Sequence, residues 1–203
     1  RSTLMRSSAA SDVYKRQVID NRNSIAFHIG GGIAIPYGNA RMIPFEKRYF
    51  SGGANSVRGW SVRSLGPGTF SDEKGNFMNQ SGDIKLDASI EYRTRLFWKF
   101  RGALFVDAGN IWTIRDYKDQ PGGQFKFDKF YKQIAVAYGL GLRLDLDFFV
   151  LRFDGGMKAI NPAYEKKKDR YPIIHPKFSR DFAFHFAAVS YTHLRAHETS
   201  AHL

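Results

Sequence analysis

The sequence contains no cysteine among its 203 residues, which excludes disulfide bonds and thiolate chemistry. No apolar run approaches the ~18 residues of a membrane-spanning helix, so a helical membrane protein is excluded as well. A membrane β-barrel is not excluded, because its sequence signal is alternation rather than a continuous run. Acidic residues are scarce, with 19 Asp and Glu against 31 Lys and Arg and a formal net charge of +12. A basic excess of this kind suits nucleic acid, an anionic membrane surface or a charged cavity.

Motifs for catalysis or cofactor binding are also missing. The sequence has no Gly-x-Ser-x-Gly elbow, no metal-spaced cluster of His, Asp and Glu, and no phosphate-binding glycine loop. We therefore predict no enzyme activity, no metal and no cofactor. His28 and His185 are isolated and are predicted to be structural. The run Lys166–Lys168 is predicted to be solvated, with a role at anionic lipid headgroups as the alternative. No recognition module accompanies the charge, so nucleic acid is not an expected partner.

The two ends of the chain show neither helical nor strand periodicity. Residues 1–17 and 189–203 resemble translated adaptor or linker sequence, and we predict that both are non-native. This prediction removes the only i,i+4 histidine pair, His193 and His197, from consideration as a metal site. Residues 18–188 are then expected to form one domain.

Alternation of apolar and polar residues is the dominant pattern of that domain. From Gln133 to Asp147 the even positions are all large and apolar, whereas the odd positions are small, polar or charged. Successive strand side chains point to opposite faces, so such a segment predicts a strand with one apolar face. The same pattern predicts five further strands: Ile25–Tyr37, Asp83–Leu96, Phe100–Trp112, Phe149–Ala159 and Asp181–Ala188.

A soluble β-sandwich would also alternate, but the connections favour a membrane barrel. Two are short, between Leu96 and Phe100 and between Leu146 and Phe149, and their lengths preserve the pairing of apolar faces. The other three are long: Gly38–Gly82, Thr113–Lys132 and Ile160–Arg180. Short turns on one side and long loops on the other are typical of outer-membrane barrels, with the apolar face toward lipid.

Aromatic residues near the strand ends suit interfacial girdles, with ordinary core packing of each one as the alternative: Tyr37, Trp98, Trp112, Phe148 and Phe149. Six strands cannot close a barrel around a charged lumen, since about eight are needed. The chain is therefore expected to be a barrel fragment.

The first long connection contains SGGANSVRGW, a single arginine framed by small residues and followed by Gly59 and an aromatic residue. Gly52, Gly53 and Gly59 permit the tight turns of a loop tip. The strand Phe100–Trp112 places Asp107 on its polar face. An arginine on a loop folded into the lumen could form a bidentate pair with this carboxylate, and Glu91 is a second candidate acceptor. The alternative is that Arg58 and Asp107 are both solvated.

These residues carry a resemblance to a known family. The loop motif Val57, Arg58, Gly59 and Trp60, together with Phe105, Asp107 and Gly109 in the strand, resembles the bacterial surface antigen superfamily of outer-membrane protein assembly factors (BamA/TamA-like). The sequences FSGGANS and RSLGPG are similar to Bacteroidetes-type members. The resemblance covers most of residues 25–188 and implies the last six of roughly sixteen strands, with the loop locked in the lumen by Arg58.

The resemblance also implies a function and a location. Members insert other β-barrels into the bacterial outer membrane, so the implied partners are the lipid bilayer and unfolded β-barrel clients. Accessory assembly proteins would bind through N-terminal POTRA domains that are missing from this sequence. Two alternatives stay open: a two-partner-type protein secretion transporter and the barrel anchor of a patatin-like lipase.

Overall fold

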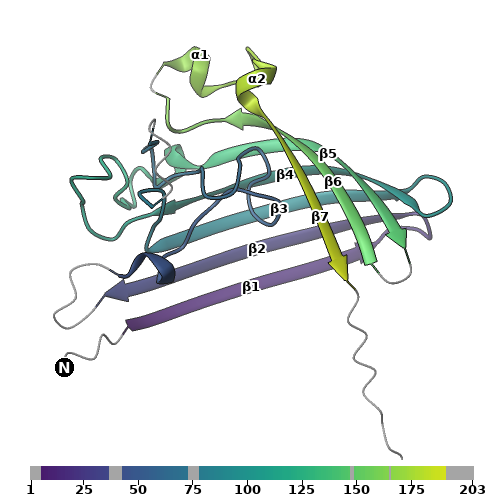
Figure 1. Cartoon of the computed structure of the whole chain (residues 1–203), viewed down its shortest axis with the longest axis horizontal. Helices are drawn as coiled ribbons and strands as arrows, with labels where there is room; N and C mark the ends of the chain where they lie inside the picture. Colours follow the sequence, from purple (N-terminus) through teal and green to yellow (C-terminus); the bar gives the residue numbers. More distant parts are fainter. Residues whose placement is uncertain (1–5, 37–42, 73–77, 147–148, 165, 191–203) are drawn as a thin grey trace, which may run out of the picture.

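The computed structural model describes residues 6–36, 43–72, 78–146, 149–164 and 166–190. Seven strands form one antiparallel sheet in sequence order (Figure 1). The strands are β1 (Arg6–Val18), β2 (Asn23–Pro36), β3 (Ile84–Arg95), β4 (Phe100–Trp112), β5 (Ala135–Leu146), β6 (Phe149–Ile160) and β7 (Phe182–Ser190). Two 3-10 helices and two short α-helices lie in the connections: η1 (Phe45–Lys47), η2 (Phe130–Gln133), α1 (Lys167–Arg170) and α2 (Phe178–Asp181). Among the described residues, no helix is long and apolar enough to cross a membrane.

The predicted hairpins and their register are confirmed. Leu146 pairs with Phe149 across the two-residue turn, and the Leu96 N–H donates to the Phe100 carbonyl across the three-residue turn. Figure 1 shows the turns that join β1 to β2 and β3 to β4 at one end of the strands, with the long connections toward the other.

The sheet is apolar outside and charged inside, which is the reverse of a soluble protein. Leu140, Ile90 and Leu104 are 65%, 54% and 52% exposed on one face. On the other face Glu91, Asp107 and Asp154 are buried beneath the loops. This arrangement fits a transmembrane barrel wall with lipid on the apolar side and a filled lumen on the polar side.

The first strand was not predicted. Residues 6–18 form β1 and pair with β2 over its whole length, from Arg6 opposite Pro36 to Val18 opposite Ser24. Backbone hydrogen bonds at a sheet edge need no apolar alternation, which is why the sequence pattern did not reveal this strand. The sheet therefore has seven strands rather than the predicted six. The non-native origin of residues 1–17 and 189–203 stays a prediction, and residues 191–203 lie outside the described residues.

The aromatic girdle was predicted incorrectly at one position. Trp98 is 71% exposed and Phe149 is partly exposed, as a membrane interface requires. Trp112 is instead fully buried, because Phe125 and Phe130 of the second long loop pack edge-on against its ring. Tyr37 and Phe148 lie outside the described residues.

Candidate functional site: the buried arginine of the first long loop

Backbone conformation and apolar packing, and not only charge, hold the tip of the first long loop in place. Gly52 and Gly53 adopt φ values of 97° and 96°, a left-handed region that favours glycine. The Gly53 N–H donates to the Trp60 carbonyl at 2.8 Å, which closes the turn. Val57 and Trp60 are buried against Ala135 and Ala137 of β5. The apolar residues on either side of Arg58 therefore anchor the tip to the inner wall.

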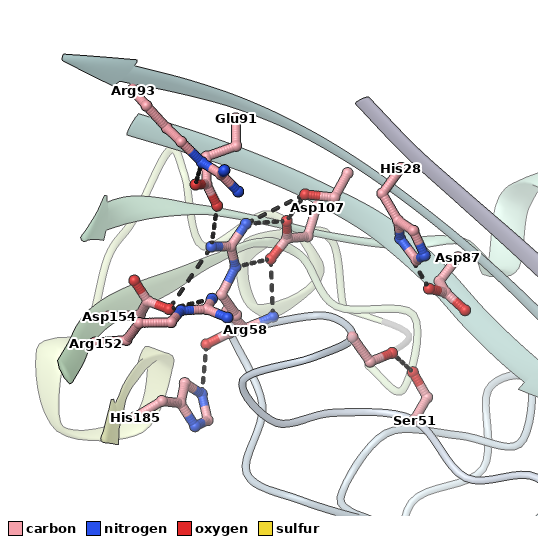
Figure 2. Close-up of polar contacts among 12 residues, drawn as sticks. His28, Ser51, Arg58, Asp87, Glu91, Arg93, Asp107, Arg152, Asp154 and His185 are labelled. Atoms are coloured by element: carbon pink, nitrogen blue, oxygen red, sulfur yellow. Dashed lines mark hydrogen bonds and ion pairs between the residues drawn. The ribbon is translucent and has the colours of Figure 1, made fainter. Parts of the chain in front are cut away.

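Arg58 forms a bidentate pair with Asp107 of β4. Its Nε donates to Asp107 Oδ2 and its Nη2 to Asp107 Oδ1, both at 2.8 Å (Figure 2). The guanidinium lies 3.5 Å from the centre of the Phe105 ring, a cation–π distance. Ser89 of β3 donates from its Oγ to Asp107 Oδ1 at 2.7 Å. The planar fork of an arginine matches both carboxylate oxygens, which a lysine could not do.

Glu91 of β3 is the second acceptor of the guanidinium. Arg58 Nη1 donates to Glu91 Oε2 at 2.7 Å. The other oxygen, Oε1, accepts from Arg93 Nε at 2.6 Å and contacts Arg143 of β5. Asp154 of β6 lies 3.7 Å from Arg58 Nη1 and accepts a hydrogen bond from Arg152. The site is thus a network of alternating charges contributed by four neighbouring strands.

The backbone of Arg58 is also fixed on both sides. Its N–H donates to Asp107 Oδ2 at 3.1 Å, and its carbonyl lies 2.9 Å from His185 Nε2 on β7. Gly156 of β6 lies directly against this carbonyl, since a Cβ there would approach the oxygen to 2.3 Å. Gly59 is similarly close to Ala137. Close approach of the loop to β5 and β6 therefore needs glycine on both surfaces.

The charged side chains of the site are almost fully buried, so the attraction between them is screened little by water. The side chains of Arg58, Asp107 and Glu91 are 4%, 1% and 7% exposed. Burial alone would lower the pKa of Arg58, but the hydrogen bonds and charges of Asp107 and Glu91 outweigh it and raise the pKa. Arg58 is consequently charged at every pH at which the fold exists. In such surroundings, removing one partner leaves a charge that neither water nor protein compensates.

Comparison with known proteins identifies the family. The Omp85 superfamily domain matches residues 2–187. The chain belongs to the Omp85 superfamily. The predicted resemblance to BamA-like proteins and the placement in the bacterial outer membrane are thereby confirmed, whereas the Bacteroidetes-type assignment stays a prediction.

Relatives of this Omp85 chain include bacterial and animal proteins. The chain is 36% identical over 102 residues to the outer membrane protein assembly factor BamA of Neisseria meningitidis. The matched region covers 45% of this chain and 12% of that protein. It is 29% identical over 135 residues to the sorting and assembly machinery component 50 homolog of Homo sapiens, covering 65% of this chain and 28% of the relative. The chain therefore spans about a quarter or less of these relatives.

Two solved structures share the fold of this Omp85 chain. The crystal structure of BamA from Haemophilus ducreyi lacking POTRA domains 1–3 superposes with a TM-score of 0.62 at 20% identity, covering 91% of this chain and 35% of that one. CdiB from Acinetobacter baumannii gives a TM-score of 0.53 at 19% identity, covering 94% and 28%. At these identities the likeness concerns the fold alone.

The structure brings most of the predicted residues of the Omp85 chain together. Arg58 meets both Asp107 and Glu91, and Phe105 lies beneath the guanidinium. Gly109 permits close packing of β4 on β3, because a Cβ there would lie 2.6 Å from the Leu86 carbonyl oxygen.

Sequence reasoning missed three contributors: Ser89, Asp154 and His185. All three lie on polar strand faces, so the alternation along each strand could have marked them as lumen-facing. Whether His185 would reach the arginine depended on the register of β7 against β6, because a long loop separates these two strands. His28, predicted to be structural, contacts Asp12 and lies 3.6 Å from Asp87 (Figure 2).

A second buried pair holds the base of the loop. Arg48 Nε donates to Asp83 Oδ1 at 3.2 Å, and its Nη2 donates to Gln120 of the second long loop at 3.3 Å. The two long loops are therefore tied to each other as well as to the wall. No group of His, Cys, Asp or Glu suited to a metal ion occurs within the described ranges.

Proposed function

We propose that this chain is part of the barrel of an outer-membrane β-barrel assembly factor, and that Arg58 locks the first long loop inside the lumen. The single observation that carries the proposal is the buried contact of Arg58 with Asp107 and Glu91 on two adjacent strands. The relatives, an outer membrane protein assembly factor and a sorting and assembly machinery component, support the same function.

The lock has two consequences in this proposal. First, the loop fills the lumen and supports the wall, because one guanidinium reaches β3 and β4 and the tip packs on β5 and β6. Second, the wall next to β7 is braced from inside through His185. Within the described residues β7 pairs only with β6, and a free strand edge is suited to pairing with an incoming strand. The proposed partners are unfolded β-barrel clients and the surrounding bilayer, with accessory proteins bound through other domains of the full-length protein.

A secretion transporter is the second candidate. The sheet fits CdiB over 94% of its length and BamA over 91%, so the fold alone does not separate the two functions. The loop lock would then gate the passage of a passenger instead of supporting a site of strand insertion. The same residues would carry both functions.

Depletion and complementation of the full-length protein separate these candidates. Cells depleted of the native protein are complemented with the wild type, with Arg58→Ala, or with the control Arg101→Ala, which removes an arginine from a partly exposed pair with Asp145. The assembly proposal expects Arg58→Ala to reduce folded levels of many outer-membrane barrels, whereas the control should behave as wild type. Normal levels of all barrels combined with loss of one exported passenger would refute assembly and favour secretion.

A further inference from the structure

A row of arginines crosses the lumen-facing side of the sheet next to its short turns. Arg95 of β3 is paired with Arg101 of β4, which is paired in turn with Arg143 of β5. Arg143 is paired with Arg152 of β6, and the Arg95 backbone N–H donates to the Arg22 carbonyl at 2.9 Å. Side chains of directly opposite residues share one face of an antiparallel sheet. The row of five arginines therefore spans four strand spacings, about 19 Å.

The row carries more positive charge than the wall balances. Like charges that lie directly opposite one another destabilise a sheet, so carboxylates are needed beside them. Among the described residues the wall supplies three pairs: Asp145 at 2.9 Å from Arg101, Asp154 at 2.8 Å from Arg152, and Glu91 in contact with Arg143. Glu91 and Asp154 are also the carboxylates that face Arg58. Two of the three carboxylates are therefore shared with the loop arginine.

Arg22 and Arg95 lie at the unbalanced end of the row. Both are exposed, and within the described parts of the chain neither side chain forms an ion pair. They line a cleft of about 110 Å³ together with Asn21 and Asp20. The Asp20 carboxylate accepts a hydrogen bond from the Asn21 backbone N–H at 2.7 Å instead of pairing with an arginine. The cleft therefore keeps an excess of positive charge that is open to solvent.

The position of the cleft restricts what can reach it. Figure 1 shows the β1–β2 and β3–β4 turns at one end of the strands and the long connections toward the other. Short turns of outer-membrane barrels face the periplasm. Arg95 lies on the same face of β3 as the buried Glu91, so lipid meets the opposite face of the wall. A ligand of this cleft therefore comes from the periplasmic mouth of the lumen.

We propose that Arg22 and Arg95 bind an extended acidic segment of a client polypeptide. An extended chain places alternate side chains on one face about 6.8 Å apart, so successive carboxylates can follow the row. The excess of positive charge selects carboxylates, and the periplasmic mouth is the side from which a newly made polypeptide reaches the outer membrane. The identity of the ligand as a client rests on the proposed function, whereas the anion site itself rests on the charges of the row.

Fluorescence anisotropy of the full-length protein in phosphatidylcholine nanodiscs tests this site. The probe is a rhodamine-labelled peptide in which Glu and Ser alternate, and the reference peptide has Gln in place of Glu. We expect the wild type to bind the Glu peptide at least about fivefold more tightly, the effect of two exposed ion pairs. The double variant Arg22→Gln with Arg95→Gln should lose this preference. Raising the salt from about 0.1 M to about 1 M shortens the screening length from about 10 Å to about 3 Å and should also remove the preference.

A matched variant controls for net charge. Lys126→Gln with Lys129→Gln removes two exposed lysines of the second long loop and should keep the preference of the wild type. An equal loss in the two double variants, or no preference in the wild type, would overturn the proposal. Displacement of the peptide by an equal concentration of inorganic phosphate, or by phosphatidylglycerol added to the nanodiscs, would also overturn it and assign the cleft to a small anion or a lipid headgroup. The peptide assay can fail while Arg58→Ala still lowers the levels of other barrels, so the two proposals are tested separately.

Discussion

Removal of the Arg58 guanidinium should destabilise the barrel through one particular carboxylate. In Arg58→Ala, Glu91 retains Arg93 and Arg143, but Asp107 retains only Ser89 among side chains. An uncompensated buried charge costs about 3–5 kcal/mol. Loss of the cation–π contact with Phe105 adds about 0.5–2 kcal/mol. The expected loss of unfolding free energy is therefore about 3.5–7 kcal/mol.

A double-mutant cycle with Asp107→Asn tests this reasoning. In the double variant no carboxylate is left at position 107, so the penalty of an uncompensated charge disappears. The cost of the double variant should be smaller than the sum of the single costs by about 2 kcal/mol or more. Equilibrium urea unfolding in lipid vesicles, followed by tryptophan fluorescence, measures each free energy.

The control cycle uses Arg101 and Asp145, whose charged atoms are 2.9 Å apart but whose side chains are 37% and 23% exposed. Its coupling should stay below about 1 kcal/mol because water screens the pair. If Arg58→Ala and Asp107→Asn were additive within about 0.5 kcal/mol, the buried network would not exist in the membrane-embedded protein. Limited proteolysis near Asn55 would show whether the loop had left the lumen.

Three further changes probe the loop contacts and the acid stability. Gly156→Ala places a Cβ 2.3 Å from the Arg58 carbonyl, so it should cost about 1–3 kcal/mol in urea unfolding and expose the loop to protease. His185→Ala should cost about 1–3 kcal/mol in the same assay by leaving that buried carbonyl unpaired, and His185→Gln should recover part of the loss if a donor is what matters. Burial would raise the pKa of Asp181, but hydrogen bonds from Arg180 and from a backbone amide lower it below 3.8. The stabilising contribution of the Asp181 carboxylate should therefore be complete above pH 3.8 and disappear as the pH falls through the lowered pKa. In Asp181→Asn the stability should depend less on pH in this range, as measured by circular dichroism during acid unfolding. An unchanged dependence on pH would contradict the assignment.

The alternating pattern predicted β2 to β7 well because a lipid-facing wall favours apolar side chains at every second position of a strand. Asp83–Leu96 was predicted and β3 spans Ile84–Arg95, since every second residue there must meet lipid. Where no such requirement acts, prediction failed. β1 pairs with β2 through its backbone and shows no apolar alternation. Trp112 occupies a position whose side chain points to the lipid-facing side, but a loop covers it.

The candidate site was partly predictable for a similar reason. Arg58 could be singled out from its glycine-rich surroundings, and Asp107 and Glu91 from their place on the polar faces. His185 could not be assigned, because a long connection separates β6 from β7 and the sequence does not set their register. The observed pairing of Asp154 with His185 places this histidine beside the network, and its Nε2 lies 2.9 Å from the Arg58 carbonyl oxygen.

The order of synthesis gives the arginine network a further meaning. Among the described residues, every side chain that forms a hydrogen bond or an ion pair with Arg58 follows it in the chain, from Ser89 through Asp107 to His185. A ribosome therefore delivers the guanidinium first and its last partner more than a hundred residues later, as the separation of 127 positions from His185 shows. The loop tip cannot complete its contacts until β7 has arrived. A finished lock thus reports that this part of the wall has been built in full and in the correct order.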